Sequence, residues 1–505
     1  MKPDFLILGN GAAAPARDIP VYEIDRFLQG IIDAVDDGWR ISSWFGVPTP
    51  GGATLYCVLS FKQDGQIGIM AAEAGLSFTS IAGLCPQASL FEREIAEQCG
   101  IVPEGHPWFK PVRFHRSFVR GRDAWGRPEA DPILPGIMDF YRVEGESVHE
   151  VAVGPIHAGI IEPGHFRFQC HGEQVFHLEI SLGYQHRGIE QALMGGPHPK
   201  SPYMIEAAAG DTTVGHSQAW CMALEALSGC RVPARAEALR GIALELERLA
   251  NHTGDLGAIA GDIGYLPTSS FCGRIRGDFL NMTAMICGSR FGRGLVRHGG
   301  TGFDLGAREV DEMLARLAEA RRDLTNAVDL LWNTPSVMGR LENTGALAPD
   351  LARELGLVGP PARACGLALD VRRDHPFGIY RVAQIPLVAG HHGDVCARSM
   401  IRWLECEKSL DFIGEQLLQL PGGPFRNPGG ELAPGHVTVA MTEGWRGEIC
   451  HVALTDASGR LARYKIVDPS FHNWQGLSIA LRGQQISDFP LCNKSFNLSY
   501  CGFDL

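Results

Sequence analysis

The sequence has no two cysteines spaced C-x-x-C, no apolar run long enough to span a bilayer, and no excess of basic residues. Its 14 cysteines are scattered through apolar segments, so we expect reduced, buried side chains rather than disulfides. A membrane span needs about 20 consecutive apolar residues. The N-terminal run FLILG is too short even for a secretion signal, whose apolar core needs roughly 7–15 residues. We therefore expect a cytoplasmic chain that reaches a membrane only through partner subunits.

Charge and composition limit the kinds of protein that this chain can be. Asp and Glu outnumber Lys and Arg by 57 to 45, which gives a net charge of −12. Binding of nucleic acid requires clustered basic residues, so nucleic acid is excluded as the main partner. Apolar residues make up 45% of the 505 positions, and a chain of that length forms about two to four domains.

The pattern of apolar residues predicts an α+β chain. Steps of three and four along residues 24–35 predict a helix, and TLYCVLSF and QIGIMAAE read as strands. Further on, VHEVAVGP, HFRFQCHG and VFHLEISLGY also read as strands, and HVTVAM and ICHVALTD follow near the end. Long helices with one apolar stripe predict a helical bundle; they cover residues 234–252, 310–331 and 394–419.

These elements predict four segments. Residues 1–19 are a tail or a first strand, and residues 20–116 form a small α/β domain. Residues 117–148 are polar and contain three prolines in HRSFVRGRDAWGRPEADPILPG, which is typical of a linker. Residues 149–505 form a larger domain with the helical bundle between β segments.

LILGNGAAA, residues 6–14, matches the glycine pattern of a dinucleotide-binding loop. Such a loop must open a helix, but Pro15 and Pro20 follow, and no acidic residue stands about 20 positions further on at a strand end. A stand-alone NAD-binding enzyme is the alternative that depends on this motif. It requires nucleotide binding by the isolated chain.

Two ionisable residues lie in tight turns. Glu162 precedes Pro-Gly at the entrance to a strand, where a carboxyl beside an apolar core can have a raised pKa and carry protons. The alternative is a turn residue that accepts backbone hydrogen bonds. His165 and Cys170 lie on opposite faces of the strand that follows, which argues against a metal site. Arg446, in TEGWRGE, occupies a hairpin turn and either points its charge into a cleft or lies on the surface.

Several strings in sequence order resemble known families. ASLFEREIAEQCGI followed by HP resembles the small, 30-kDa-type subunit of respiratory complex I. The later strings resemble the 49-kDa-type, quinone-site subunit of complex I and, still more closely, the large subunit of energy-converting [NiFe] hydrogenases, including the formate hydrogenlyase type. In that type the two domains are fused in this order. The strings are GPIHAGIIEPGHFRF, GYQHRGIE, LELERLANH, VRRDHP, GDVCARSMIRWLECEKS, EGWRGE and YKIVDPSFHN.

The resemblance also indicates what has been lost. The hydrogenase family carries R-x-C-G-x-C and D-P-C-x-x-C, whose four thiolates hold nickel and iron. In this sequence the four positions are Ala209, Thr212, Ser499 and Gly502, and Cys501 is one position out of register. Such residues cannot replace soft thiolate ligands. We therefore expect no nickel and no other cofactor on this chain, and no H2 chemistry.

The quinone side is incomplete as well. The second histidine of G-P-Q-H-P-x-x-H in complex I corresponds to Ile161 here, and its tyrosine falls near Tyr203, although Met204 fits the count better. A quinone, if bound, would lie near Tyr203 and Asp211. By family analogy Glu162 is the proton-transfer glutamate and Arg446 the arginine over the active site. The same region is lined, by the same analogy, by His165, Arg187, Glu190, Asp211, Arg372, Arg373 and Asp374.

The resemblance implies a large-subunit homologue in a membrane-bound, complex-I/hydrogenase-related oxidoreductase that couples electron transfer to proton or ion translocation. It would form a hetero-oligomeric complex with a small iron–sulfur subunit, which carries the nearest [4Fe-4S] cluster, and with antiporter-like membrane subunits. The alternatives are a quinone-reducing subunit in the altered cleft, an ordinary hydrogenase or formate hydrogenlyase large subunit, or a non-catalytic coupling scaffold. The retained motifs would then simply hold the fold.

Overall fold

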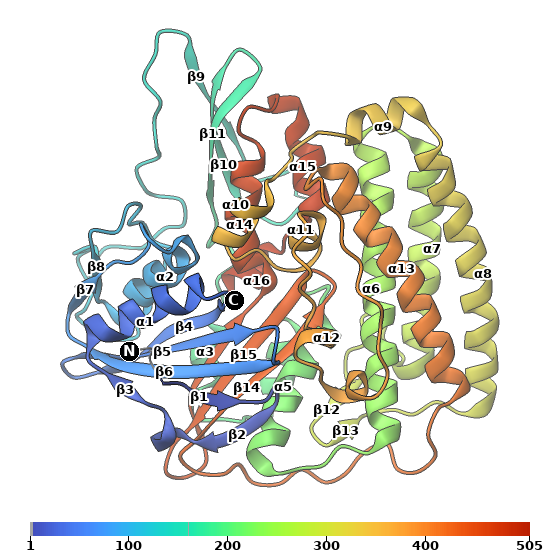
Figure 1. The fold of residues 1–505 in the computed structure, drawn as a ribbon, viewed down its shortest axis with the longest axis horizontal. Coiled ribbons are helices and arrows are strands. Elements are labelled where there is room, and N and C mark those ends of the chain that lie inside the picture. The colour runs from blue at the N-terminus through green and yellow to red at the C-terminus, as the bar shows by residue number, and fades with distance from the viewer. Residues whose placement is uncertain (1–3, 160) are drawn as a thin grey trace.

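The computed structural model describes residues 4–159 and 161–505. Figure 1 shows a sheet-rich part, which contains the N-terminal third of the chain, beside a bundle of long helices. Helices and sheets are both extensive, so the predicted α+β class is confirmed. No helix among the described residues is long and apolar enough to cross a membrane.

The N-terminal domain is a five-stranded sheet covered by two helices. Its strand order is β1-β6-β5-β4, and β3 pairs with β6 in parallel. Phe27, Ile31 and Trp44 are fully buried in its core, as expected from the apolar stripe of the first helix. The elements are β1 (Leu6–Leu8), β3 (Val21–Tyr22), α1 (Ile24–Asp36), β4 (Arg40–Thr49), β5 (Gly52–Phe61), β6 (Gln66–Ala74), β7 (Ser77–Thr79), α2 (Ser89–Cys99) and β8 (Val102–Glu104).

The connection to the second domain is long. Across residues 105–147, all of them described, the chain forms turns and bends without a helix or strand. It then enters a three-stranded antiparallel sheet of order β11-β10-β9, which projects at the top of Figure 1. The strands are β9 (Val148–Val153), β10 (His165–His171) and β11 (Gln174–Ser181).

Within the described residues, four long helices form the bundle, and a fifth, α5, packs mainly on the strands β14 and β15. The helix α6 packs against both α7 and α13, and α8 covers the outer side of α7 and α13. Three of these helices confirm the predicted ones, but α6 continues ten residues past the predicted end at residue 252, and α7 was not predicted. The helices are α5 (Thr213–Ser228), α6 (Ala234–Asp262), α7 (Leu266–Cys287), α8 (Ala307–Trp332) and α13 (Val395–Leu418).

A four-stranded sheet, of order β16-β15-β14-β2, lies between the N-terminal domain and the bundle. Its hairpin β14–β15 pairs Gly444 with Gly447, so that Trp445 and Arg446 form the turn, as predicted. The edge strand β2 comes from the N-terminus and pairs with β14. The strands are β2 (Ala12–Pro15), β14 (His436–Gly444), β15 (Gly447–Thr455) and β16 (Leu461–Val467).

The N-terminal segment therefore joins two sheets, since β1 pairs with β6 and β2 with β14. Its glycine-rich motif lies in the turn between these strands, and a short 3-10 helix, residues 16–18, follows β2. No α-helix opens at Gly9 or Gly11, so this segment lacks the strand–loop–helix geometry of a dinucleotide-binding loop.

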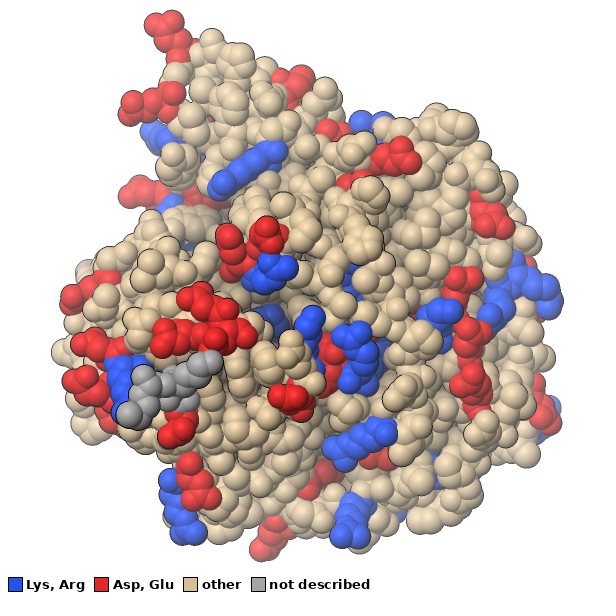
Figure 2. Space-filling view, viewed as in Figure 1, with Lys and Arg blue, Asp and Glu red and all other residues tan. Residues whose placement is uncertain are grey.

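On the face shown in Figure 2, Lys and Arg side chains are interspersed with Asp and Glu.

Short elements connect the larger ones. The short elements are α3 (Ile189–Leu193), α4 (Ser201–Glu206), β12 (Val296–Arg297), β13 (Gly300–Thr301), α9 (Pro335–Leu341), α10 (Pro349–Glu354), α11 (Gly359–Ala364), α12 (Val371–Asp374), α14 (Pro469–Ala480), α15 (Phe489–Phe496) and α16 (Tyr500–Asp504).

Candidate functional site

Three segments that lie far apart in the sequence meet at one place, which corresponds to the cleft expected from the family resemblance and keeps that name below. They are the turn that precedes α5, the hairpin turn of β14–β15, and the C-terminal segment that leads into α16. The Trp445 indole N–H joins the first two, because it lies 3.0 Å from the Asp211 carbonyl and 3.1 Å from Thr212 Oγ1. Arg446 joins the third, because its Nε donates to the Asn497 carbonyl at 2.5 Å.

A bidentate ion pair spans the centre of this cleft. Arg446 donates from Nη1 and Nη2 to the two carboxylate oxygens of Asp211, at 2.6 and 2.8 Å. Its guanidinium also lies over the Trp445 ring, 3.8 Å from the centroid. Burial raises the pKa of Asp211, but the charge of Arg446 and its hydrogen bonds lower it more, so the net shift is downward. Both groups are therefore charged, and the predicted turn arginine faces the cleft.

The four positions that bear cysteine in the hydrogenase family provide no soft ligand here. Ala209 is a fully buried methyl group, and Thr212 Oγ1 is engaged by the Trp445 indole and by Arg446. Ser499 Oγ accepts the Gly502 amide at 2.9 Å and caps α16. These residue types do not fit a four-thiolate nickel–iron site.

Space at the fourth position is taken by a carboxylate. A Cβ added at Gly502 would lie 2.7 Å from Asp468 Cγ and Oδ2 and 2.9 Å from Ser499 Oγ. Asp468 is itself held, since its Oδ2 is 3.0 Å from His216 Nε2 and its Oδ1 accepts the Ser470 amide at 2.8 Å. A side chain at position 502 would therefore have to displace a fixed, buried acid.

Behind Asp468 runs a buried chain of polar side chains. His216 Nδ1 lies 3.1 Å from His451 Nε2, and His451 Nδ1 lies 2.8 Å from the Tyr464 hydroxyl. Burial lowers the pKa of His451 well below its usual value, and His216 lowers it further. Sequence analysis singled out neither Asp468 nor His451. The string YKIVDPSFHN contained the signal for Asp468, because an aspartate before proline caps a helix start.

Glu162 does lie at the cleft, on the side of the C-terminal segment. Its carboxylate accepts the Tyr500 amide at 3.2 Å and hydrogen-bonds the Cys501 thiol. The thiol is also held by the Gly210 amide and by Ser499 Oγ, 3.4 Å away. Burial, together with the charge of Glu162, raises the pKa of Cys501 to about 11. Cys501 is therefore a protonated thiol at neutral pH.

Arg187 ties the first and third segments together. Its Nη2 donates to the carbonyls of Ala208, at 3.0 Å, and Cys501, at 2.7 Å. Its backbone amide donates to the Leu505 carbonyl at 2.7 Å. This residue therefore positions the cleft walls through the backbone.

Other residues named from the family analogy lie elsewhere. His165 hydrogen-bonds the Gly154 carbonyl at 3.2 Å and Arg167 at 3.1 Å, within the β9–β10 sheet. Glu190 is paired with Lys465 at 2.9 Å on the inner side of β16. Tyr203 is 63% exposed, with Arg297 against its ring, so its hydroxyl is not enclosed by this chain.

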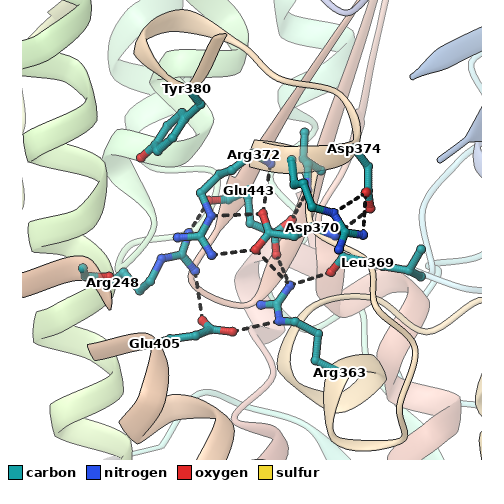
Figure 3. Close-up of polar contacts among 12 residues, drawn as sticks. Arg248, Arg363, Leu369, Asp370, Arg372, Asp374, Tyr380, Glu405 and Glu443 are labelled. Carbon is teal, nitrogen blue, oxygen red and sulfur yellow. Dashed lines mark hydrogen bonds and ion pairs between the residues drawn. The ribbon is translucent and has the colours of Figure 1, made fainter. Parts of the chain in front are cut away.

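A buried charge network supports the hairpin from behind (Figure 3). Arg248 donates to the carbonyls of Glu443, at 2.7 Å, and Gly444, at 3.2 Å, which directly precede the turn. Arg363 lies 2.7 Å from the Glu443 carboxylate and 2.8 Å from Glu405. Arg372 continues the network, paired with Asp370 at 2.6 Å and Glu245 at 3.1 Å.

Arg373 and Asp374, which follow Arg372 in the sequence, pair with each other at 2.7 Å. The Arg373 side chain is 42% exposed.

Within the described residues, no three or more His, Cys, Asp or Glu side chains are arranged to hold a metal ion. Cys492 is buried near Arg398.

The fold and the cleft define a class: two-domain subunits in which a small α/β domain precedes a sheet-and-bundle domain with an arginine-bearing hairpin over the cleft. Residues 27–122 match the family of the 30 Kd subunit of respiratory-chain NADH dehydrogenase. Residues 262–433 and 425–504 match the family of its 49 Kd subunit.

Relatives that align over most of their own length give the same result. The carbon monoxide-induced hydrogenase of Rhodospirillum rubrum is 32% identical over 352 residues, 70% of this chain and 98% of that protein. Formate hydrogenlyase subunit 5 of Escherichia coli (strain K12) is 30% identical over 471 residues, 89% and 81% of the two chains. NADH-quinone oxidoreductase subunit 4 of Thermus thermophilus is 29% identical over 371 residues, which are 66% of this chain and 89% of that protein. The chain belongs to this family of fused 30-kDa-type and 49-kDa-type subunits of complex I and related hydrogenases.

Proposed function

We propose that this chain is the cleft-forming large subunit of a complex-I-related, energy-converting oxidoreductase at the cytoplasmic membrane, and that it carries no nickel–iron centre. In this role it couples electron transfer to proton or ion translocation without H2 chemistry of its own. The relatives support the first part, because they are named as hydrogenase, formate hydrogenlyase and NADH-quinone oxidoreductase subunits.

One observation supports the proposal that the chain carries no nickel–iron centre. The Asp468 carboxylate fills the space beside Gly502, and the Arg446–Asp211 pair spans the cleft beside Thr212. Three of the four cysteine positions are thus bound into a polar network of oxygen and nitrogen atoms, and Ala209 adds only a methyl group. A dication with soft ligand preferences gains nothing from such a site.

The same proposal includes partners. We propose a small iron–sulfur subunit whose [4Fe-4S] cluster lies nearest this cleft, and antiporter-like membrane subunits that hold the complex at the membrane. The support is that a relative 28% identical over 365 residues is named membrane-bound hydrogenase subunit alpha, a name that implies further subunits. This chain would then be peripheral, attached through its partners.

The test is to purify the intact complex through a tag on this chain and to measure metals and H2 uptake. We expect iron from the partner subunit, nickel far below one atom per chain, and no H2 uptake. A cysteine-bearing hydrogenase purified in the same way controls for metal loss during purification. Nickel at one atom per chain, or H2 uptake at the rate of that control, would overturn the proposal.

A further inference from the structure

A second feature adjoins the cleft at Asp211. It is a small pocket of about 10 Å³ between the start of α5, the middle of α6 and the end of α7. Arg290 and Phe291 lie at its exposed side, and Phe291 is 43% exposed. The side chains of Asp211 and Glu247 both line it, so the pocket adjoins the Arg446–Asp211 pair.

Glu247 is the unusual group in this pocket. It is nine-tenths buried, and its two carboxyl oxygens accept the backbone amides of Val214, at 2.7 Å, and Gly215, at 3.1 Å. Among the residues that the structure describes, no Lys or Arg forms an ion pair with it. The contrast is Glu245, two positions away on the same helix but on another face, which lies 3.0 Å from Arg248 and 3.1 Å from Arg372.

The groups around Glu247 shift the pKa of its carboxyl in both directions. Burial raises the pKa of its carboxyl, the two amides at the start of α5 lower it, and the Asp211 charge raises it again. Arg248, on its own helix, lowers it slightly, and the net result is a pKa of about 8. Arg290, which faces the pocket from the segment after α7, also favours the charged form. A buried carboxyl without a cationic partner holds its proton at neutral pH.

We propose that Glu247 is a proton-exchange site that opens to solvent through this pocket. In the step, the Glu247 O–H bond breaks, the proton passes to water, and the carboxylate that remains is held by the amides of Val214 and Gly215. The reverse step restores the neutral acid. The exchange is a property of this chain alone, whereas any use of it in ion translocation rests on the proposed function.

Loss of the proton has a consequence for the cleft. It places a second negative charge beside Asp211, which strengthens the electrostatic potential that holds Arg446. Because the amides belong to the first turn of α5, the charge also favours the N-terminus of that helix. The protonation state of Glu247 is thereby linked to the ion pair that spans the cleft.

Infrared difference spectroscopy of the full-length chain across a pH titration tests the proposal. The carbonyl band of protonated carboxyl groups is recorded for the wild type and for Glu247→Gln, and the two titrations are subtracted. We expect a component that disappears with a midpoint near pH 8 and is absent from the variant. Glu354→Gln, exposed on α10, is the control and keeps the component. A subtraction without a titrating component, or with a midpoint near that of an exposed glutamate at about 4.3, overturns the proposal.

Two further variants keep the test independent of the folding of Glu247→Gln. Arg290→Gln removes a cation at the pocket and raises the midpoint, whereas Asp211→Asn removes an anion and lowers it. A midpoint that moves in neither variant contradicts solvent exchange through this pocket. These measurements need no partner subunits or nickel assay, so they fail or succeed separately from the proposed function.

Discussion

At the scale of single residues, the cleft differs from a metal site in more than its missing sulfur atoms. Ser499 now caps a helix, and the Thr212 hydroxyl is bound by its neighbours. At Gly502 the space itself is gone, because the Asp468 carboxylate occupies it. These positions should therefore respond differently when a cysteine is put back.

Gly502→Cys should destabilise the chain, whereas Ser499→Cys should not. The new Cβ at position 502 would meet Asp468 at 2.7 Å, and forcing atoms into a packed site costs about 1–3 kcal/mol. Sulfur for oxygen at Ser499 adds less than one methylene in size, and we expect a cost below about 1 kcal/mol. The measurement is the midpoint of urea unfolding for each variant. Equal midpoints for Gly502→Cys and the wild type would show that Asp468 moves aside freely.

Sequence analysis also predicted least at the scale of single residues. Glu162 and Arg446 could be singled out because each stands beside glycine or proline in a recognisable turn. Asp468 and His451 could not be assigned to the cleft, because their contacts with His216 join positions more than 230 residues apart. Tyr203 was expected near a quinone, but its orientation depends on how the short helix α4 packs, which no local pattern determines.

At the scale of elements, the helix α7 shows why a regular pattern can escape notice. Its buried residues include Thr268, Cys272, Ile275, Phe279 and Met282, in steps of four, three, four and three. That is the period of a helix, but two of these residues are not strongly apolar. Gly273 and Gly277 also lower its helix propensity. Burial against α6 and α8 stabilises the helix despite that propensity.

The buried charge network supports the hairpin turn, and the stability that this network contributes depends on pH. Burial raises the pKa of Glu245, but the charges of Arg248 and Arg372 lower it to about 2, compared with about 4.3 in an unfolded chain. Because the folded-state pKa is the lower one, the stabilisation is complete above the unfolded value. It is lost as the pH falls from about 4 to about 2.

Glu245→Gln should therefore cost stability at neutral pH and very little in acid. Each unit of pKa shift corresponds to 1.36 kcal/mol, so we expect a loss of about 3 kcal/mol near pH 7 that shrinks below about pH 4. Urea unfolding of both proteins over this pH range measures it. The matched control is Glu354→Gln, exposed on α10, which should change stability by less than about 0.5 kcal/mol at every pH. A loss that is the same in acid and at neutral pH would contradict the ion-pair explanation.

At the scale of the whole molecule, the two domains are joined by more than the segment between them. The Asn10 side chain donates to the carbonyls of His375, at 2.7 Å, and Met441, at 2.8 Å. Lys465 on β16 reaches across to Glu94 on α2 at 2.6 Å, with both side chains buried. Sequence analysis placed the domains by their patterns, but it could not show this interface, because charged residues in a helix are ordinarily expected at the surface.

Two separately expressed halves, divided within residues 105–147, should therefore assemble and copurify. The first half contributes β1 and β2, and only the assembled pair covers the edge of β14 with a strand. Lys465→Met in the second half removes one of the two cations that pair with the buried Glu94, Arg113 being the other. Loss of this charged hydrogen bond costs about 1.5–3 kcal/mol and weakens the association about ten- to a hundredfold. Lys62→Met, at an exposed position in the first half, is the control and should leave the affinity unchanged. Size-exclusion chromatography and titration of one half with the other measure both effects. Halves that elute as separate folded proteins would show instead that the covalent connection, and not the buried contacts, keeps the domains together.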